Sequence, residues 1–339
     1  MMNKEKVTSM QVAKLAGVSQ SAVSRVFTKG ASASQKTVDK VKKAADELGY
    51  RPNVLARAMV SGKSRIIGLV VAYLDNQFYP QAIEKLSQAL QEQGYHILIF
   101  LTSKTEDNID KVVDEILDHQ VDGIIAASVA LSSELASRCS AAGVPIVLFN
   151  RSQDGDNLSS VTSDNFSAAA KAARFLLAGG HQRIAYIAGW EGTSTSKDRE
   201  IGFVNALEQA GQKLHAKEIG NFTREEASEA THRLFSKKSP PDAIFVANDH
   251  MALAVMDTLR YELGLKIPDD VSVIGFDDVP ASSWPAYNLT TLRQRSNLMV
   301  AETIKVLLEQ IDGKVLTAQQ VAIGSPLIVR NSARIPDDW

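Results

Sequence analysis

The sequence predicts an all-α helix-turn-helix unit at the N-terminus, followed by an α/β unit built from two doubly wound lobes. Two observations predict this division. The chain has 339 residues, which exceeds the length at which a single hydrophobic core keeps growing. Near residue 65, short helical segments separated by glycine give way to apolar strands that alternate with amphipathic helices. We therefore expect at least two units of different fold class.

Charge is distributed unevenly between these two parts. Residues 1–65 contain 13 Lys and Arg against 4 Asp and Glu, whereas residues 66–339 contain 24 against 35. The net charge is therefore +9 on the first part and −11 on the second, within a whole-chain charge of −2. A compact basic unit is typical of a protein that binds nucleic-acid phosphates, although an unstructured basic tail would give the same counts.

Composition argues against several other classes of protein. The single cysteine, Cys139, leaves no internal disulfide and no cysteine-rich zinc site, and the sequence predicts neither a metal site nor a cofactor. No stretch of about 18 apolar residues occurs, and the N-terminus lacks the apolar segment of an export signal. We therefore expect a cytoplasmic, nucleoid-associated protein.

Two short helices joined by a glycine turn are predicted near the N-terminus. Thr8 followed by Gln11 forms a capping box, and the helix that it opens ends at Gly17. Ser19 is a candidate N-cap for a second helix over residues 20–27. In DNA-binding proteins with this arrangement, the second helix enters the major groove.

The second helix carries a polar face, and a third helix completes a small core. The polar face offers an amide, two hydroxyls and a guanidinium, which are groups suited to base edges and phosphates. These groups belong to Gln20, Ser21, Ser24 and Arg25. The third helix runs from a cap at residue 34 to residue 48. A plain three-helix bundle with a solvated polar face is the alternative interpretation.

Residues 52–62 predict a short connecting helix. Pro52 stands at a preferred first helical position, and a helix of roughly eight residues follows it. A helix of this length is only marginally stable alone, so we expect its structure to depend on a partner.

Alternating strands and helices predict the two lobes of the remaining chain. The first series has strands at 65–71, 97–100, 123–127 and 145–149 and helices at 80–93, 108–119 and 132–142. The second series has strands at 184–188, 243–246 and 271–276 and helices at 167–178, 199–209, 225–235 and 249–263. Such alternation favours parallel sheets covered by helices on both faces. Two facing lobes of this kind form a ligand cleft at the carboxyl ends of their strands.

Five sequence motifs along the chain are similar to those of one protein family. In the first part they are VTSMQVAKLAGVSQSAVSRVF and SQKTVDKVKKAADELGYRPNVLARAM. In the second part they are ANDHMAL, VSVIGFDD and LTTLRQ. On these motifs the chain resembles the lac repressor (LacI/GalR) family, whose sensor is similar to a periplasmic sugar-binding protein. The resemblance spans almost the whole chain and implies a repressor controlled by a small effector.

By position, the resemblance implies three groups of DNA contacts. Base contacts would fall on Gln20, Ser21 and Arg25. Phosphate contacts would fall on Thr8, Ser19, Ser24, Ser34 and Thr37. Minor-groove contacts would fall on Ala56 and Met59, and Met59 replaces the leucine that the family wedges between base pairs. Met59 could instead pack on the second unit as a linker residue.

The resemblance also implies a set of effector contacts at strand ends and helix starts. Charged groups would pair with polar ligand groups, amides would bridge hydroxyls, and aromatic rings would cover an apolar ring face. The implied residues are Phe78, Tyr79, Asn150, Ser196, Arg199, Phe222, Asn248, Asp277 and Gln294. A salt bridge without ligand is the alternative for Arg199 and Asp277, and ordinary packing is the alternative for Phe78 and Phe222. Asn150 replaces an acidic residue of some members, so a sugar, a sugar acid or a related metabolite all stay open.

The expected domain limits follow from these assignments. A helix-turn-helix domain covers residues 1–51, a hinge helix and linker cover 52–64, and an effector-binding and dimerisation domain covers 65–339. We expect the first lobe at about 65–162 plus 293–321 and the second lobe at about 163–292 plus 322–339. The chain would then cross between the lobes near 150–164, 290–294 and 321–323.

Together these features predict a sequence-specific regulator that binds a pseudo-palindromic operator as a homodimer, because one helix-turn-helix contacts too few base pairs for specificity. An enzyme is one alternative. However, no P-loop, zinc-binding or nucleophile motif occurs, and the neighbouring Asp277 and Asp278 would point in opposite directions from a strand. A solute receptor is another alternative, and the N-terminal helices argue against it. We expect a repressor without catalytic residues or a membrane partner, whose operator affinity depends on a small polar metabolite.

Overall fold

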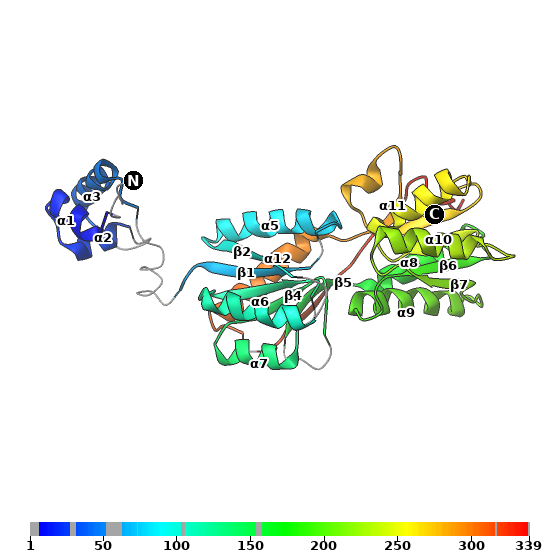
Figure 1. The fold of residues 1–339 in the computed structure, drawn as a ribbon, viewed down its shortest axis with the longest axis horizontal. Helices are drawn as coiled ribbons and strands as arrows, with labels where there is room; N and C mark the ends of the chain where they lie inside the picture. The colour runs from blue at the N-terminus through cyan, green and yellow to red at the C-terminus, as the bar shows by residue number, and fades with distance from the viewer. Residues whose placement is uncertain are drawn as a thin grey trace. The chain divides into compact units, whose positions relative to one another are not determined.

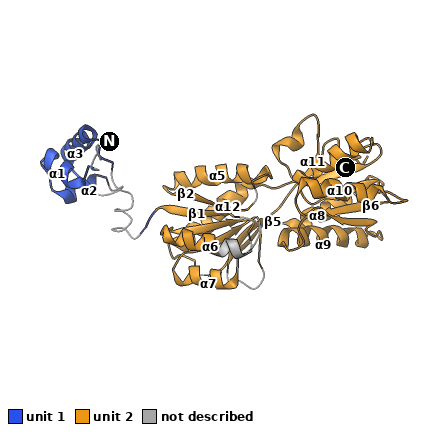
Figure 2. Cartoon of the chain, viewed as in Figure 1, with its two compact units in different colours: residues 1–64 blue, residues 65–339 orange. Residues whose placement is uncertain are grey.

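The computed structural model describes residues 7–27, 32–51, 63–72, 74–102, 106–129, 131–153, 158–315 and 317–337. The chain forms two compact units, residues 1–64 and 65–339 (Figure 2). The predicted connecting helix, with the proposed DNA contacts Ala56 and Met59, lies outside the described residues.

The described residues of the N-terminal unit form three helices: α1 (Ser9–Ala16), α2 (Gln20–Val26) and α3 (Gln35–Leu48) (Figure 1). The predicted capping box is present, since the Thr8 amide donates to Gln11 Oε1 at 2.8 Å and the Gln11 amide donates to the Thr8 hydroxyl at 3.4 Å. Gly17 follows α1 with a φ of 66°, a left-handed conformation that glycine adopts at little cost. The helices share a small core of Val12, Ala13, Ala16, Val23, Val41, Ala44 and Ala45.

The first lobe contains a six-stranded parallel sheet with the order β11-β5-β4-β3-β1-β2. Its strands are β1 (Ile66–Val71), β2 (His96–Leu101), β3 (Gly123–Ala127), β4 (Ile146–Phe149), β5 (Ser159–Ser163) and β11 (Gln320–Ile323). Its helices are α5 (Phe78–Glu92), α6 (Glu106–Asp118), α7 (Ser133–Ala141) and α12 (Ser296–Ile311). Helices α5 and α12 pack together on one face, and α6 and α7 cover the other (Figure 1). The strands β3 and β4 are buried along their whole length, as expected between two helical layers.

The second lobe repeats this plan with the strand order β12-β10-β9-β8-β6-β7. Its strands are β6 (Ile184–Ala188), β7 (Ala216–Ile219), β8 (Ala243–Val246), β9 (Ser272–Asp277), β10 (Thr290–Arg293) and β12 (Leu327–Ile328). Its helices are α8 (Asn165–Ala178), α9 (Ser194–Gln209), α10 (Arg224–Phe235) and α11 (Asp249–Asp257), and α11 continues into a π-helical turn at Thr258–Glu262. Only β12 pairs antiparallel among the described strands of this sheet. Helix α8 packs on α9, and α10 packs on α11.

Three segments of the chain cross between the lobes. The strand β5 leads into α8, β10 leads into α12, and β11 leads into β12. The first lobe extends to Ile323 rather than to residue 321, because β11 pairs with β5 through that residue. Any change in the angle between the lobes must therefore be accommodated at these three crossings.

A close contact between α8 and α9 leads to a testable prediction. A Cβ atom at Gly202 of α9 would lie 2.2 Å from the carbonyl oxygen of Phe166, so the backbone would have to move. Gly202→Ala is expected to lower the free energy of unfolding by roughly 1–3 kcal/mol, measured by urea denaturation. Ile201→Ala is the matched control, because Ile201 lies on the same helix with its side chain half exposed. Equal losses for the two variants would contradict this packing.

Candidate functional site

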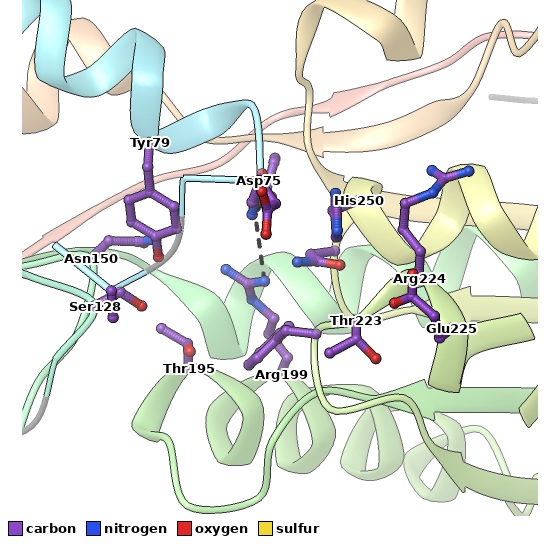
Figure 3. Close-up of a pocket in the computed structure, with 15 residues that line it drawn as sticks. Asp75, Tyr79, Ser128, Asn150, Thr195, Arg199, Thr223, Arg224, Glu225 and His250 are labelled. Carbon is purple, nitrogen blue, oxygen red and sulfur yellow. Dashed lines mark hydrogen bonds and ion pairs between the residues drawn. The ribbon is translucent and has the colours of Figure 1, made fainter. Parts of the chain in front are cut away.

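A cavity of about 370 Å³ lies between the two lobes (Figure 3). The first lobe contributes segments that follow β1, β3 and β4, and the second lobe contributes the starts of α9, α10 and α11 and the end of β9. The volume falls within the range of roughly 300–1,000 Å³ that is typical of small-molecule sites. The lining residues are Ala72, Asp75, Asn76, Tyr79, Ser128, Asn150, Thr195, Arg199, Phe222, Thr223, Arg224, Glu225, Asn248, His250 and Asp277.

A buried guanidinium, that of Arg199, lies on the second-lobe side of this cavity. Its Nε donates to Asn165 Oδ1 at 2.8 Å, and its Nη1 donates to the Ala247 carbonyl oxygen at 2.5 Å. The guanidinium also stacks on the Phe276 ring, with 3.5 Å between its carbon and the ring centroid. Burial lowers the pKa of Arg199, and the nearby Asp277 carboxylate opposes that shift. These contacts fix the direction in which Arg199 can donate to a ligand.

The carboxylate of Asp277 connects the two lobes. Its Oδ1 lies 4.0 Å from Arg199 Nη1 and accepts a hydrogen bond from Gln294 Nε2 at 2.7 Å. Its Oδ2 accepts a hydrogen bond from Asn76 Nδ2, a first-lobe residue, at 3.2 Å. Burial raises the pKa of Asp277 to about 7, and this effect exceeds the opposing effect of Arg199. A ligand that contacts Asp277 would therefore touch a group that is already shared between the lobes.

On the first-lobe side, Tyr79 and Asn150 form a polar wall. Asn150 Nδ2 donates to Tyr79 Oη at 3.1 Å. The other amide atom, Asn150 Oδ1, is buried and accepts no hydrogen bond from the described residues. Asn150 has a φ of 60°, which is tolerated better by asparagine than by most residues. An unsatisfied buried acceptor beside a cavity favours a ligand that can donate a hydrogen bond to it.

Phe222 covers another part of the cavity. Gly189 makes room for it, since a Cβ atom at Gly189 would lie 2.0 Å from the Phe222 ring. The neighbouring helices α10 and α11 begin with the N-caps Thr223 and Asn248, whose side chains accept hydrogen bonds from the amides of Glu226 and Met251. The cavity thus combines one aromatic wall with capped helix starts.

Of the nine implied effector residues, six line the cavity: Tyr79, Asn150, Arg199, Phe222, Asn248 and Asp277. The other three lie outside the lining. Phe78 is buried and stacks on Phe149, with 6.1 Å between the ring centroids. This placement agrees with the alternative of ordinary packing for Phe78. Ser196 is buried within the first turn of α9, and Gln294 contacts Asp277 rather than the cavity.

Sequence reasoning missed several lining residues. They are Ala72, Asp75, Asn76, Ser128, Thr195, Thr223, Arg224, Glu225 and His250. Most of them follow a strand or begin a helix, so the rule that ligands bind beyond strand ends could have indicated them.

The implied base and phosphate contacts belong to the three described helices of the N-terminal unit or to their N-caps. Gln20, Ser21, Ser24 and Arg25 are exposed on α2. Three of the implied phosphate contacts, Thr8, Ser19 and Ser34, are exposed N-caps, and Thr37 is half-buried one turn after Ser34. Exposed hydroxyls at helix starts are suited to phosphate oxygens.

The described part of the chain offers neither a metal site nor a membrane-spanning helix. No group of His, Cys, Asp or Glu residues there could hold a metal ion. No helix there is long and apolar enough to span a membrane.

A helix-turn-helix unit joined to a two-lobed unit with a polar cavity defines a ligand-responsive DNA-binding regulator. The family model described as bacterial regulatory proteins, lacI family, matches residues 10–53. The model described as periplasmic binding proteins and sugar binding domain of LacI family matches residues 64–318. The chain therefore belongs to the LacI family of bacterial transcription regulators.

Individual relatives match over nearly the whole chain. The HTH-type transcriptional regulator DegA of Bacillus subtilis (strain 168) is 32% identical over 336 residues, which cover 96% of this chain and 98% of DegA. The HTH-type transcriptional repressor PurR of Vibrio vulnificus (strain CMCP6) is 30% identical over 330 residues, which cover 96% of this chain and 98% of PurR. A crystal structure of the lac repressor dimer bound to operator and the anti-inducer ONPF is 27% identical, with a TM-score of 0.87 and coverage of 97% of this chain and 99% of the repressor chain. The predicted fold class is thereby confirmed.

Proposed function

We propose that this regulator is a repressor whose affinity for operator DNA is controlled by a small polar metabolite, a sugar or a sugar acid, bound between its lobes. The observation that carries the proposal is the interlobe cavity, where Arg199 and Asp277 of the second lobe face Tyr79 and Asn150 of the first. The sugar-binding description of the matched family model supports the class of effector. The six implied residues in the lining are the proposed effector contacts, and Phe78, Ser196 and Gln294 act at most through their neighbours.

The N-terminal unit binds the DNA in this proposal. Gln20, Ser21 and Arg25 contact bases from the exposed face of α2, which is the element that enters a major groove in this motif. The phosphate contacts are Thr8, Ser19, Ser24, Ser34 and Thr37. Ala56 and Met59 are proposed minor-groove contacts on the strength of the family resemblance.

A homodimer on a pseudo-palindromic operator is part of the same proposal. One helix-turn-helix contacts too few base pairs for specificity in a genome. Both lobes expose large apolar side chains, with Ile99 and Leu101 on the edge strand β2 and Tyr261 and Trp284 on the second lobe. Exposed apolar surface of this kind is typical of contacts between subunits.

The proposed control acts through the angle between the lobes. A ligand that holds Asp277 and Asn150 together favours one lobe arrangement, and the three crossings connect that arrangement to the rest of the chain. The ligand shifts the population of the DNA-binding form by its difference in affinity for the two arrangements.

Catalysis is not part of the proposed function. Asp278, the neighbour of Asp277, does not line the cavity. Its Oδ2 lies 2.5 Å from Arg293 Nε, and its Oδ1 lies 2.6 Å from Arg330 Nη2. The two carboxylates therefore do not form an acid and base pair around one substrate bond. We place the protein in the cytoplasm because that is where operator DNA is found in bacteria.

Thermal denaturation of the full chain with sugars and sugar acids tests this function. A ligand that binds the native state raises the melting temperature, by an amount that grows with its concentration. A compound that raises it should also change the affinity of the protein for operator DNA selected from a random pool. A melting shift without a change in DNA affinity would contradict a regulatory effector.

A further inference from the structure

The cations that line the cavity are already engaged by the protein. Arg199 is held by Asn165, Ala247 and Asp277. The Nη2 of Arg224 donates to Asp257 Oδ2 at 3.1 Å, outside the cavity lining. The lining contains no lysine. Its third basic side chain, the imidazole of His250, also has an interaction within the protein. A ligand carboxylate or phosphate would find no full positive charge that lacks a protein partner among the described residues.

Two carboxylates that line the cavity, those of Asp75 and Glu225, have no cationic partner among the described residues. The side chains of Asp75 and Glu225 form no ion pair or hydrogen bond with the described residues. Asp75 comes from the first lobe and Glu225 from the start of α10, so both lobes contribute one (Figure 3). Arg199 is paired with Asp277 and Arg224 with Asp257, so the carboxylates of Asp75 and Glu225 carry the unpaired charge of the lining. The resulting field opposes the entry of an anion.

The helix starts do not reverse this field. The N-terminus of a helix attracts anions through its free amides and its dipole. At the cavity, the side chains of Thr193, Thr223 and Asn248 already accept hydrogen bonds from the amides of α9, α10 and α11. The first turn of α10 also contains Glu225 and Glu226, which neutralise its positive end. An anionic ligand group would therefore compete with groups of the protein at each helix start.

The hydrogen-bonding groups of the cavity require a ligand that donates as well as accepts. Asn150 Oδ1 accepts no hydrogen bond from the described residues, and the carboxylates can only accept while they are ionised. Arg199 can only donate. A hydroxyl group both donates and accepts, whereas an ionised carboxylate or phosphate dianion cannot donate to Asn150.

From these four observations we infer that the effector is a polyhydroxyl compound without an anionic group, a sugar or polyol, and that Asp75 and Glu225 exclude sugar acids and sugar phosphates. The inference rests on the proposed function, because it concerns the same cavity. It removes sugar acids from the proposed effectors, and it assigns their exclusion to two named side chains.

The test compares matched ligands that differ in charge. Isothermal titration of the full chain would use neutral pentoses, hexoses and hexitols, with the uronic acid, 6-phosphate and 2-amino form of each hexose. We expect a neutral compound to bind about tenfold or more tightly than its acid and its phosphate, which corresponds to roughly 1.4 kcal/mol. Tighter binding of the acid or the phosphate would overturn the inference. If no compound of the panel binds, the proposed sugar effector itself is wrong and the inference falls with it.

Variants of Asp75 and Glu225 test whether these two side chains discriminate against acidic ligands. In Asp75→Asn with Glu225→Gln, the acid should gain about tenfold in affinity, while the neutral compound changes less than about twofold. Glu229→Gln is the matched control, because Glu229 lies on the same helix α10, is exposed and is absent from the lining. High salt should reduce the discrimination in the unmodified protein, since it screens exposed charges. An unchanged ratio of acid to neutral affinity in the double variant would overturn the role of these two carboxylates.

Discussion

Arg199→Ala is expected to abolish the response of DNA binding to the effector and to destabilise the C-terminal unit. The guanidinium holds Asn165, the Ala247 carbonyl and Asp277 in one buried cluster. Its removal leaves Asp277 buried without its cation, a change that costs about 3–5 kcal/mol in comparable buried pairs. The measurements are urea denaturation and effector titration of the operator complex. An Arg199→Ala protein that still responds to the effector would exclude the cavity as the sensing site.

Because a destabilised protein could lose its response without a specific reason, Asp277→Asn serves as the second variant. It preserves the size of the side chain and removes the charge, so effector affinity should fall about 10- to 100-fold without general loss of structure.

Burial raises the pKa of Asp277 from 3.8 to about 7 on folding. An acid with a raised pKa in the folded state reduces stability as the pH rises through that window. The unmodified protein should therefore lose stability relative to Asp277→Asn between about pH 4 and pH 7. Parallel stability curves would contradict a buried carboxylate here.

The N-terminal helices could be predicted from the sequence because their limits depend on neighbouring residues. Thr8 and Gln11 bond to each other three positions apart, and Gly17 ends the helix through its own backbone conformation. Caps of this kind need no distant contact. The same local rules indicated the starts of α2 and α3 at Ser19 and Ser34.

The strand β5 could not be predicted in the same way. Its sequence, Ser159–Ser163, is mostly polar, yet it is buried in the first sheet. Its serines are satisfied by residues far along the chain: Gln310 Nε2 donates to the Ser159 hydroxyl at 2.9 Å, and the Gln319 amide does so at 3.0 Å. Hydrophobic periodicity contains no information about such partners.

The sequence predicted several residues of the cavity but not its unpaired charges. The resemblance transfers positions such as Arg199 and Asp277, which lie on a helix and at a strand end whose places are fixed by the fold. It does not transfer the direction of a side chain. Phe78, for example, lies in the core against Phe149 and not in the cavity lining. The charges that carry the inference on effector class, Asp75 and Glu225, belong to a loop and a helix start that the motifs do not cover.

Arg25→Ala is expected to weaken binding to selected operator DNA far more than binding to unrelated DNA. Arg25 is exposed in the last turn of α2, where a guanidinium can donate two hydrogen bonds to one guanine. Loss of that pair should cost about 1–3 kcal/mol, or roughly 5- to 150-fold in affinity for each half-site. The measurement is a gel shift at fixed salt with an operator selected from a random pool by the unmodified protein.

A charge-matched control separates base contact from general attraction to DNA. Lys42 is exposed on α3, so Lys42→Ala removes one positive charge and none of the proposed base contacts. Because attraction to phosphates is independent of sequence, Lys42→Ala should reduce binding to both DNAs by a similar small factor. Selection repeated with Arg25→Ala should lose preference at one base pair of each half-site and keep it elsewhere, since each bidentate contact discriminates at its own position. If Arg25→Ala instead lowers both affinities equally and keeps the selected sequence, Arg25 contacts phosphate, and the specificity must come from Gln20 and Ser21.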